Sequence, residues 1–128
     1  MIIDTSAILA ILLAEPDAKR YATAIAAASP RRMSAVAVLE AAMVIESRGG
    51  TEAGLELDAF LQRAGVELVP VTREQTDAAR RGWRRFGKGN HPAAMNFGDC
   101  FAYALAKTYG EPLLFKGDDF SGTDIEKA

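Results

Sequence analysis

Short apolar segments alternate with stretches of helical periodicity along the whole chain. The apolar segments predict four strands, at residues 2–3, 31–34, 66–71 and 113–115. Apolar positions at helical spacing predict helices over residues 7–14, 18–28, 35–48, 52–63, 73–86 and 97–109. Strands that alternate with helices favour a parallel sheet covered on both faces. We therefore expect an α/β fold, a three-layer α/β/α sandwich with a short central parallel sheet.

Local signals set the expected ends of these elements. Residues that suit the N-cap position precede the helices: Ser6, Asp17, Ser34, Thr51, Thr72 and Asn96. Thr72 and Gln75 have the spacing of a capping box. Gly49 and Gly50 are expected to end one helix before the next begins. Pro70 cannot donate a backbone hydrogen bond, which suggests that the strand at 66–71 lies at an edge.

Composition limits the classes of protein that fit. The chain has 128 residues, enough for one domain with a sizeable core, and we expect a single domain over residues 1–128. Its formal net charge is −2, so binding to nucleic acid would depend on local basic patches. One cysteine and one histidine exclude an internal disulfide and a structural zinc site. The apolar run at residues 7–14 is too short to span a bilayer, and we expect a cytoplasmic protein.

Acidic residues follow the first and the last predicted strands. Asp4 ends the first apolar segment, and Asp118 and Asp119 come just after the last one. The carboxyl ends of parallel strands lie along one edge of a sheet, where ligands bind, so these acids can meet there. Alternatively, Asp4 caps the next helix, and the Asp118–Asp119 pair is a solvated turn. For that pair taken alone, the solvated turn is the better interpretation.

Two further acids lie within predicted helices. Glu40 shares a helical face with Val36, Met43 and Ser47. We expect that face to point toward the core or a cleft, although Glu40 could equally extend to water. Asp99 is the third residue of a helix capped by Asn96, where a carboxylate completes a capping box. Aromatic neighbours suggest that this helix end is packed, so Asp99 could equally hold a metal.

Each acid alone can be explained by a structural role, but such roles do not explain why the fold would bring all of them together. Carboxylates that a fold brings together repel one another unless a cation lies between them. Oxygen ligands with few nitrogen or sulfur partners favour Mg²⁺, with Mn²⁺ as a substitute, over zinc. Mg²⁺ keeps bound waters and contacts phosphate oxygens, which indicates phosphoryl chemistry. Two such ions about 3.5–4 Å apart would stabilise both oxygens of a phosphodiester displacement.

A basic stretch between residues 73 and 91 is the candidate RNA-binding surface. It contains Arg80, Arg81, Arg84, Arg85 and Lys88. Trp83, Phe86 and His91 are interleaved with these cations, which is suited to gripping phosphates and stacking exposed bases. The alternative is an amphipathic helix with solvated arginines. Lys116, beside the acids, could contact phosphate or be solvated.

Four segments together resemble the PIN-domain nucleases, and more narrowly the VapC toxins of bacterial toxin–antitoxin pairs. These are residues 1–6 (MIIDTS), 33–40 (MSAVAVLE), 96–100 (NFGDC) and 113–120 (LLFKGDDF). The resemblance covers essentially the whole chain. It implies a Mg²⁺-dependent endoribonuclease in which a metal-bound water attacks an RNA phosphodiester. It also implies a VapB-like antitoxin that blocks the acidic cleft, and a homodimer as the underlying unit.

The resemblance also implies roles for individual residues. Asp4 and Asp99 would be the principal metal ligands, and Glu40 would complete the acidic pocket. Thr5, Ser6 and Asn96 would orient these ligands through hydrogen bonds. Many relatives carry a fourth acid three residues before the closing Phe120, where this chain has Gly117. Asp118 or Asp119 would then supply the fourth carboxylate, and the position beside Phe120 favours Asp119.

Other functions fit parts of the pattern. A structure-specific DNA nuclease would share the fold and the acids. A non-catalytic module that regulates transcription through a DNA-binding partner would explain the missing acid at Gly117. A phosphatase with Asp4 as nucleophile is disfavoured because Ser6 stands where such enzymes carry a second Asp. The apolar residues Leu9, Leu12, Leu13, Tyr21 and Ile25 suggest a groove for a partner helix, unless they all pack inside.

Overall fold

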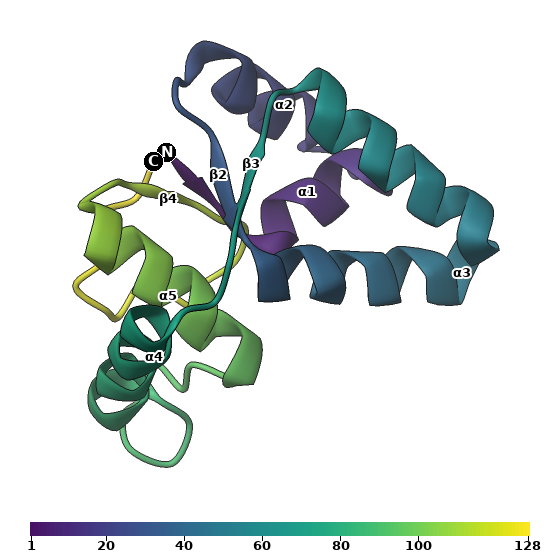
Figure 1. Cartoon of the computed structure of the whole chain (residues 1–128). Helices are drawn as coiled ribbons and strands as arrows, with labels where there is room; N and C mark the ends of the chain where they lie inside the picture. The colour runs from purple at the N-terminus through teal and green to yellow at the C-terminus, as the bar shows by residue number, and fades with distance from the viewer.

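Four short parallel strands form the centre of the computed structural model, which describes residues 1–128. They are β1 (Ile2–Ile3), β2 (Arg32–Ser34), β3 (Glu67–Val69) and β4 (Leu113–Leu114), in the order β3-β2-β1-β4 (Figure 1). β1 is a central strand, and both of its residues are fully buried. The carboxyl end of β1 therefore lies between those of β2 and β4, where the fold brings distant segments together.

Helices pack on both faces of this sheet. They are α1 (Thr5–Leu12), α2 (Ala18–Ala27), α3 (Ala35–Arg63), α4 (Arg73–Phe86) and α5 (Phe97–Tyr109). Successive strand residues point to opposite faces, so Ile2 joins the core under α4 and α5, while Ile3 joins the core under α1, α2 and α3. This arrangement confirms the predicted α/β/α sandwich with a parallel sheet. None of the five helices has the length and apolarity needed to cross a bilayer.

The start of α1 and the capping of α2 differ from the sequence prediction. α1 begins at Thr5 because Asp4, and not Ser6, is its N-cap. The Asp4 side chain accepts a hydrogen bond from the Ser6 backbone N–H at 3.0 Å. Asp17 occupies the N-cap of α2 but makes no capping hydrogen bond with its side chain, since Lys116 binds that carboxylate instead. The alternative that Asp4 caps a helix is thus confirmed.

The predicted helices at 35–48 and 52–63 are the two arms of α3. Gly50 has φ 71° and ψ −171°, a non-helical conformation that only glycine adopts readily. The chain bends sharply at this point, and the second arm returns toward the sheet (Figure 1). The prediction of a break at Gly49–Gly50 is confirmed, because the non-helical backbone of Gly50 separates the two helical arms. Thr72 and Gln75 form only half of a capping box. The Gln75 backbone N–H donates to Thr72 Oγ1, but the Gln75 side-chain amide donates to Thr108 Oγ1 instead of bonding back to Thr72.

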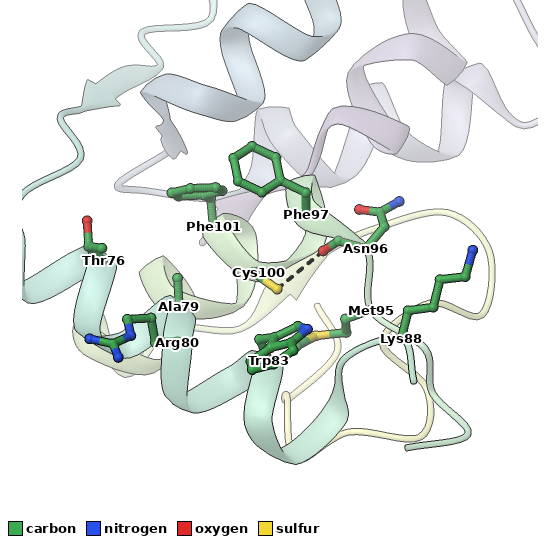
Figure 2. Close-up of a pocket in the computed structure, with 10 residues that line it drawn as sticks. All are labelled: Thr76, Ala79, Arg80, Trp83, Lys88, Met95, Asn96, Phe97, Cys100 and Phe101. Carbon is green, nitrogen blue, oxygen red and sulfur yellow. Dashed lines mark hydrogen bonds between the residues drawn. The ribbon is translucent and has the colours of Figure 1, made fainter. Parts of the chain in front are cut away.

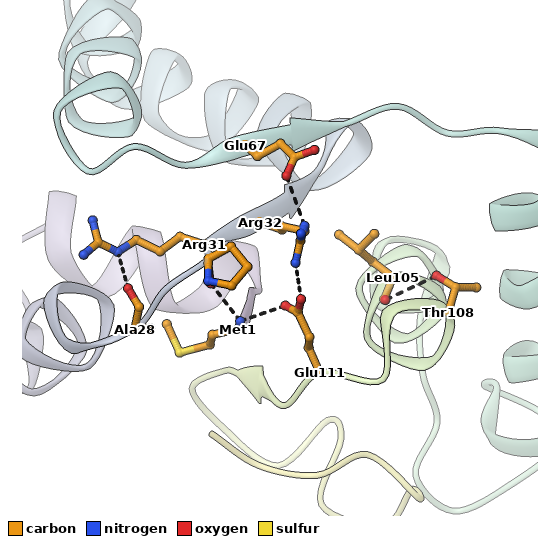
Figure 3. A network of polar contacts seen from close by, with 9 residues as sticks. Met1, Ala28, Arg31, Arg32, Glu67, Leu105, Thr108 and Glu111 are labelled. Atoms are coloured by element: carbon orange, nitrogen blue, oxygen red, sulfur yellow. Dashed lines mark hydrogen bonds and ion pairs between the residues drawn. The ribbon is translucent and has the colours of Figure 1, made fainter.

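Ionic contacts join three strands at the amino end of the sheet. Arg32 on β2 pairs with Glu67 on β3 at 3.0 Å and with Glu111 just before β4 (Figure 3). The Arg32 guanidinium also lies 4.6 Å from the centre of the Tyr109 ring. β3 is an edge strand, as Pro70 predicts, although it is shorter than residues 66–71. These contacts hold the end of the sheet opposite to the predicted acidic site.

Candidate active site

Asp4 is fixed at the carboxyl end of β1. Its backbone N–H donates to the Leu114 carbonyl at 2.9 Å, which continues the pairing of β1 with β4. One carboxylate oxygen, Oδ2, accepts from the Ser6 hydroxyl at 2.6 Å as well as from the Ser6 N–H. Asp4 is only 7% exposed. The cap and the strand end together hold this carboxylate in a defined orientation inside the protein.

Ser6 connects Asp4 to the segment that follows β4. Its hydroxyl donates to Asp4 and accepts a hydrogen bond from the Lys116 backbone N–H at 2.9 Å. The neighbouring Thr5 hydroxyl donates instead to the Ala37 carbonyl of α3, at 2.9 Å. Of these two residues, Ser6 orients the carboxylate directly, whereas Thr5 holds α1 against α3.

Asp99 lies in the first turn of α5. Its Oδ2 accepts from the Asn96 backbone N–H, and its own N–H donates to Asn96 Oδ1, both at 2.9 Å. This is the complete capping box that the sequence predicts. Asp99 is nevertheless only 7% exposed, so the capping role and a buried carboxylate coexist. Asn96 thus orients Asp99 as Ser6 orients Asp4.

Glu40 reaches the same turn of α5 from α3. A Cβ atom placed on Gly98 would lie 2.3 Å from Glu40 Oε2, so the absence of a side chain at Gly98 makes room for this carboxylate. Glu40 is half-buried, whereas Met43 on the same helical face is 64% exposed. The expectation of a buried apolar face around Glu40 is therefore wrong at Met43. Nothing in the sequence pattern singles out Gly98.

The charges of Glu40 and Asp119 disfavour the ionised form of the two buried acids, Asp4 and Asp99. Burial, followed by the charges of Asp119, Asp4 and Glu40, raises the pKa of Asp99 to about 7 against the backbone hydrogen bond of Asn96. Burial is also the main reason that the pKa of Asp4 is raised, with Glu40 and Asp119 adding to it. Asp119 is an exposed residue of the turn after β4, and its charge raises the pKa of both buried acids.

In the turn after β4, Gly117 occupies the position where the family resemblance would place a fourth acid. Gly117 has φ +92°, a conformation in which an aspartate would be strained. The acid two positions later, Asp119, acts electrostatically on Asp4 and Asp99. Asp118 is exposed on the same turn and is not among the leading charges that raise either pKa.

No cationic side chain neutralises these acids. None of the four takes part in an ion pair. The nearest candidate in sequence, Lys116, instead pairs with Glu15 and with Asp17, the latter at 2.9 Å. These hydrogen bonds raise the pKa of Lys116 and lower that of Asp17. The Lys116 side chain is thus engaged elsewhere, and two buried carboxylates lack a counter-charge.

The donor set suits a hard divalent cation held by few protein ligands. No three Asp, Glu, His or Cys side chains lie close enough to hold one ion together. Mg²⁺ is usually bound through one or two carboxylates and several waters, so it does not need three. Asp4 and Asp99 are buried, oriented by hydrogen bonds and uncompensated, which fits such an ion.

The cations of the basic stretch do not all lie on one surface of α4. Arg80 and Lys88 line a cavity of about 490 Å³ between α4 and α5 (Figure 2). Arg85 points elsewhere and pairs with Asp124 at 3.1 Å, while Arg81 and Arg84 are exposed outside the cavity wall. The sequence prediction treated these cations as one strip, whereas the structure gives only two of them a common cavity.

The raised pKa of Asp99 predicts how metal-free stability depends on pH. The folded protein keeps this proton up to about pH 7, whereas an unfolded aspartate loses it near its usual pKa of 3.8. The group therefore favours the folded state most below that usual value, and this contribution is lost as pH rises to about 7. Asp99→Asn should remove this dependence.

Thermal unfolding in EDTA at about pH 5 and about pH 8 tests this expectation. The wild type should lose several more degrees of melting temperature over this interval than Asp99→Asn. Asp17 and Asp124, whose pKa values are lowered, titrate below the interval and leave the comparison unaffected. Equal losses of melting temperature in the two proteins would show that ionisation of Asp99 does not destabilise the fold.

Comparison with known proteins agrees with this architecture. Residues 1–126 match the PIN domain family. The chain is 55% identical over 125 residues to Ribonuclease VapC30 of Mycobacterium tuberculosis, covering 98% of this chain and 95% of that protein. It is 56% identical over 125 residues to Ribonuclease VapC of Mycolicibacterium smegmatis, covering 98% and 97%. The chain therefore belongs to the PIN-domain family and, within it, to the VapC ribonucleases.

A solved structure supports the fold independently. The crystal structure of VapC20 of Mycobacterium tuberculosis, a toxin that cleaves the sarcin–ricin loop, matches with a TM-score of 0.79. The match covers 99% of this chain and 97% of that chain at 18% sequence identity. At this identity the likeness concerns the fold alone.

Proposed function

We propose that this protein is a Mg²⁺-dependent endoribonuclease toxin of a type II toxin–antitoxin pair, active in the cytoplasm. The observation that carries the proposal is a pair of buried carboxylates, Asp4 and Asp99, without a counter-charge in a chain of the VapC family. Mn²⁺ would substitute for Mg²⁺ because both are octahedral oxygen-binding ions.

In this mechanism Asp4 and Asp99 would hold the cation, and the hydrogen bonds from Ser6 and Asn96 keep their oxygens oriented. The bound ion would lower the pKa of a water and polarise the phosphodiester. Glu40, half-buried against Gly98, would complete the acidic pocket and accept a proton in the cleavage step. Asp119 adds negative charge that strengthens cation binding. Asp118 is the less favoured candidate for this last role.

A cognate VapB-like antitoxin and a homodimer are the proposed partners. Leu9 and Leu12 are only partly buried in the free chain and remain candidates for an antitoxin groove. Tyr21 and Ile25 are buried in the core, so the prediction that they form part of that groove is wrong. Co-expression with a cognate antitoxin should suppress toxicity and yield a stable complex.

Side-by-side digestion of total RNA and structured DNA by the purified, antitoxin-free protein tests the function. We expect discrete RNA fragments with Mg²⁺ or Mn²⁺, none with EDTA, and intact DNA. Cleavage of DNA alone would indicate a structure-specific DNA nuclease. No cleavage by folded protein under any divalent metal would favour a non-catalytic module.

Ser6→Ala tests the orientation of Asp4. It removes the hydroxyl that joins the Asp4 carboxylate to the Lys116 backbone but keeps the residue 6 N–H. Partners of metal ligands typically contribute about 10- to 100-fold to metal affinity or activity, and we expect a loss of RNA cleavage in that range. Ser47→Ala, an exposed serine whose hydroxyl binds Val44 O, serves as the matched control. Equal rates for the two variants would remove Ser6 from the mechanism.

A further inference from the structure

A cavity of about 490 Å³ lies beside the acidic site, between α4 and α5. Figure 2 shows its walls, to which both helices and the loop between them contribute. The lining residues that carry the argument are Arg80, Trp83, Lys88, Met95, Asn96 and Phe97. Its volume lies within the range of about 300–1,000 Å³ that is usual for small-molecule sites. Neither the metal chemistry nor the fold requires such a cavity.

Exposed aromatic rings mark this cavity as a site for a flat, apolar group. Trp83 is 50% exposed and Phe97 is 78% exposed, large fractions for aromatic side chains in a free protein. Phe97 packs edge-to-face on Phe101 with ring centres 5.1 Å apart. Base-on-aromatic stacking is the usual way in which proteins bind unpaired nucleobases.

The charges at the rim favour an anionic ligand. Arg80 and Lys88 line the cavity and form no ion pair within the chain, unlike Arg85, which is neutralised by Asp124. Helical spacing explains the division, since Arg80 shares a flank of α4 with Trp83, whereas Arg81 faces outward. Free cations around an aromatic cavity suit a base together with its phosphates.

The cavity is continuous with the acidic site through the first turn of α5. Asn96 lines the cavity and also forms the capping box with Asp99. Phe97 faces the cavity, and the next residue, Gly98, lies against Glu40. The Asn96 side-chain NH₂ makes no hydrogen bond within the chain and is free to donate to a ligand. A base in the cavity would therefore place its attached phosphates toward the acids.

We infer that this cavity binds one unpaired nucleobase of the RNA substrate next to the bond that is cut, with Trp83 and Phe97 contacting the base and Arg80 and Lys88 holding the adjoining phosphates. The inference rests on the proposed ribonuclease function. It adds a specificity site, because the base accepted here would select where the RNA is cleaved.

Trp83 provides the measurement, because it is the only tryptophan of the chain. Its fluorescence is titrated in EDTA with RNA hexanucleotides of different base composition and with an abasic ribose-phosphate oligomer of equal charge. We expect saturable quenching by at least one RNA and none by the abasic oligomer. Phe97→Ala and Arg80→Ala should each weaken this binding about 5- to 100-fold. Arg48→Ala, an exposed charge change on α3, should leave it unchanged.

Three results would overturn the inference: no quenching by any RNA, equal quenching by the abasic oligomer, or quenching that follows protein concentration alone. The last would assign the cavity to a second copy of the chain. Digestion of total RNA with Mg²⁺ by the same preparation separates the two proposals. Cleavage without quenching would reject the base site and retain the nuclease. Quenching without cleavage would retain the base site and reject the nuclease.

Discussion

Asp99→Asn is expected to lower RNA cleavage by at least about 1,000-fold, because several kcal/mol of metal-dependent stabilisation would be lost. The fold should persist, since an asparagine side-chain oxygen can still accept the hydrogen bond from the Asn96 backbone N–H. Removing a buried carboxylate whose pKa is raised to about 7 also relieves repulsion among the acids. Growth arrest on expression of the toxin should disappear in parallel.

Asp58→Asn is the matched control for this experiment. Asp58 lies on the second arm of α3, is exposed and forms no ion pair, so its loss changes the net charge equally without touching the site. It should cleave RNA at the wild-type rate. Full activity of Asp99→Asn beside this control would reject the assignment of Asp99.

Gly82→Ala is expected to destabilise the protein by about 1–3 kcal/mol, the usual range for overpacking a core. A Cβ atom at Gly82 on α4 would lie 2.5 Å from the ring of Tyr103 on α5. Tyr103 is buried and its hydroxyl donates to Asp124 at 2.9 Å, so the ring cannot move aside freely. The two helices would have to separate, and urea or thermal unfolding would measure the loss.

Gly54→Ala provides the comparison. The atoms nearest to a Cβ there belong to the end of the flexible Glu46 side chain, which can move away. This substitution should be neutral or slightly stabilising, because alanine favours a helix over glycine by about 1 kcal/mol. If Gly82→Ala were equally well tolerated, the claim that α4 packs closely on α5 at this position would be wrong.

The parts of the site that the sequence predicts best are those built by local interactions. Asn96 and Asp99 are three residues apart, so their capping box depends only on the first turn of one helix. Asp4 follows a two-residue apolar strand, and its position at the sheet edge follows from parallel topology. The first feature needs no knowledge of the remaining fold, and the second needs only the predicted parallel sheet.

Features that depend on tertiary packing could not be predicted from the sequence. The proximity of Glu40 to Gly98 requires α3 and α5 to meet at one place, and no periodicity encodes that contact. Lys116 and Arg85 resemble phosphate-binding cations in sequence, but neighbours in space, Asp17 and Asp124, bind them instead. A charge pattern alone cannot distinguish an ion pair within the chain from a free cation.

Calorimetric titration with Mn²⁺ tests most directly whether the acidic site is a divalent-cation site. The account predicts saturable binding to the wild type that is lost in both Asp4→Asn and Asp99→Asn and retained in Asp58→Asn. Circular dichroism would verify that all four proteins are folded. Undiminished Mn²⁺ binding in the two site variants would contradict the account.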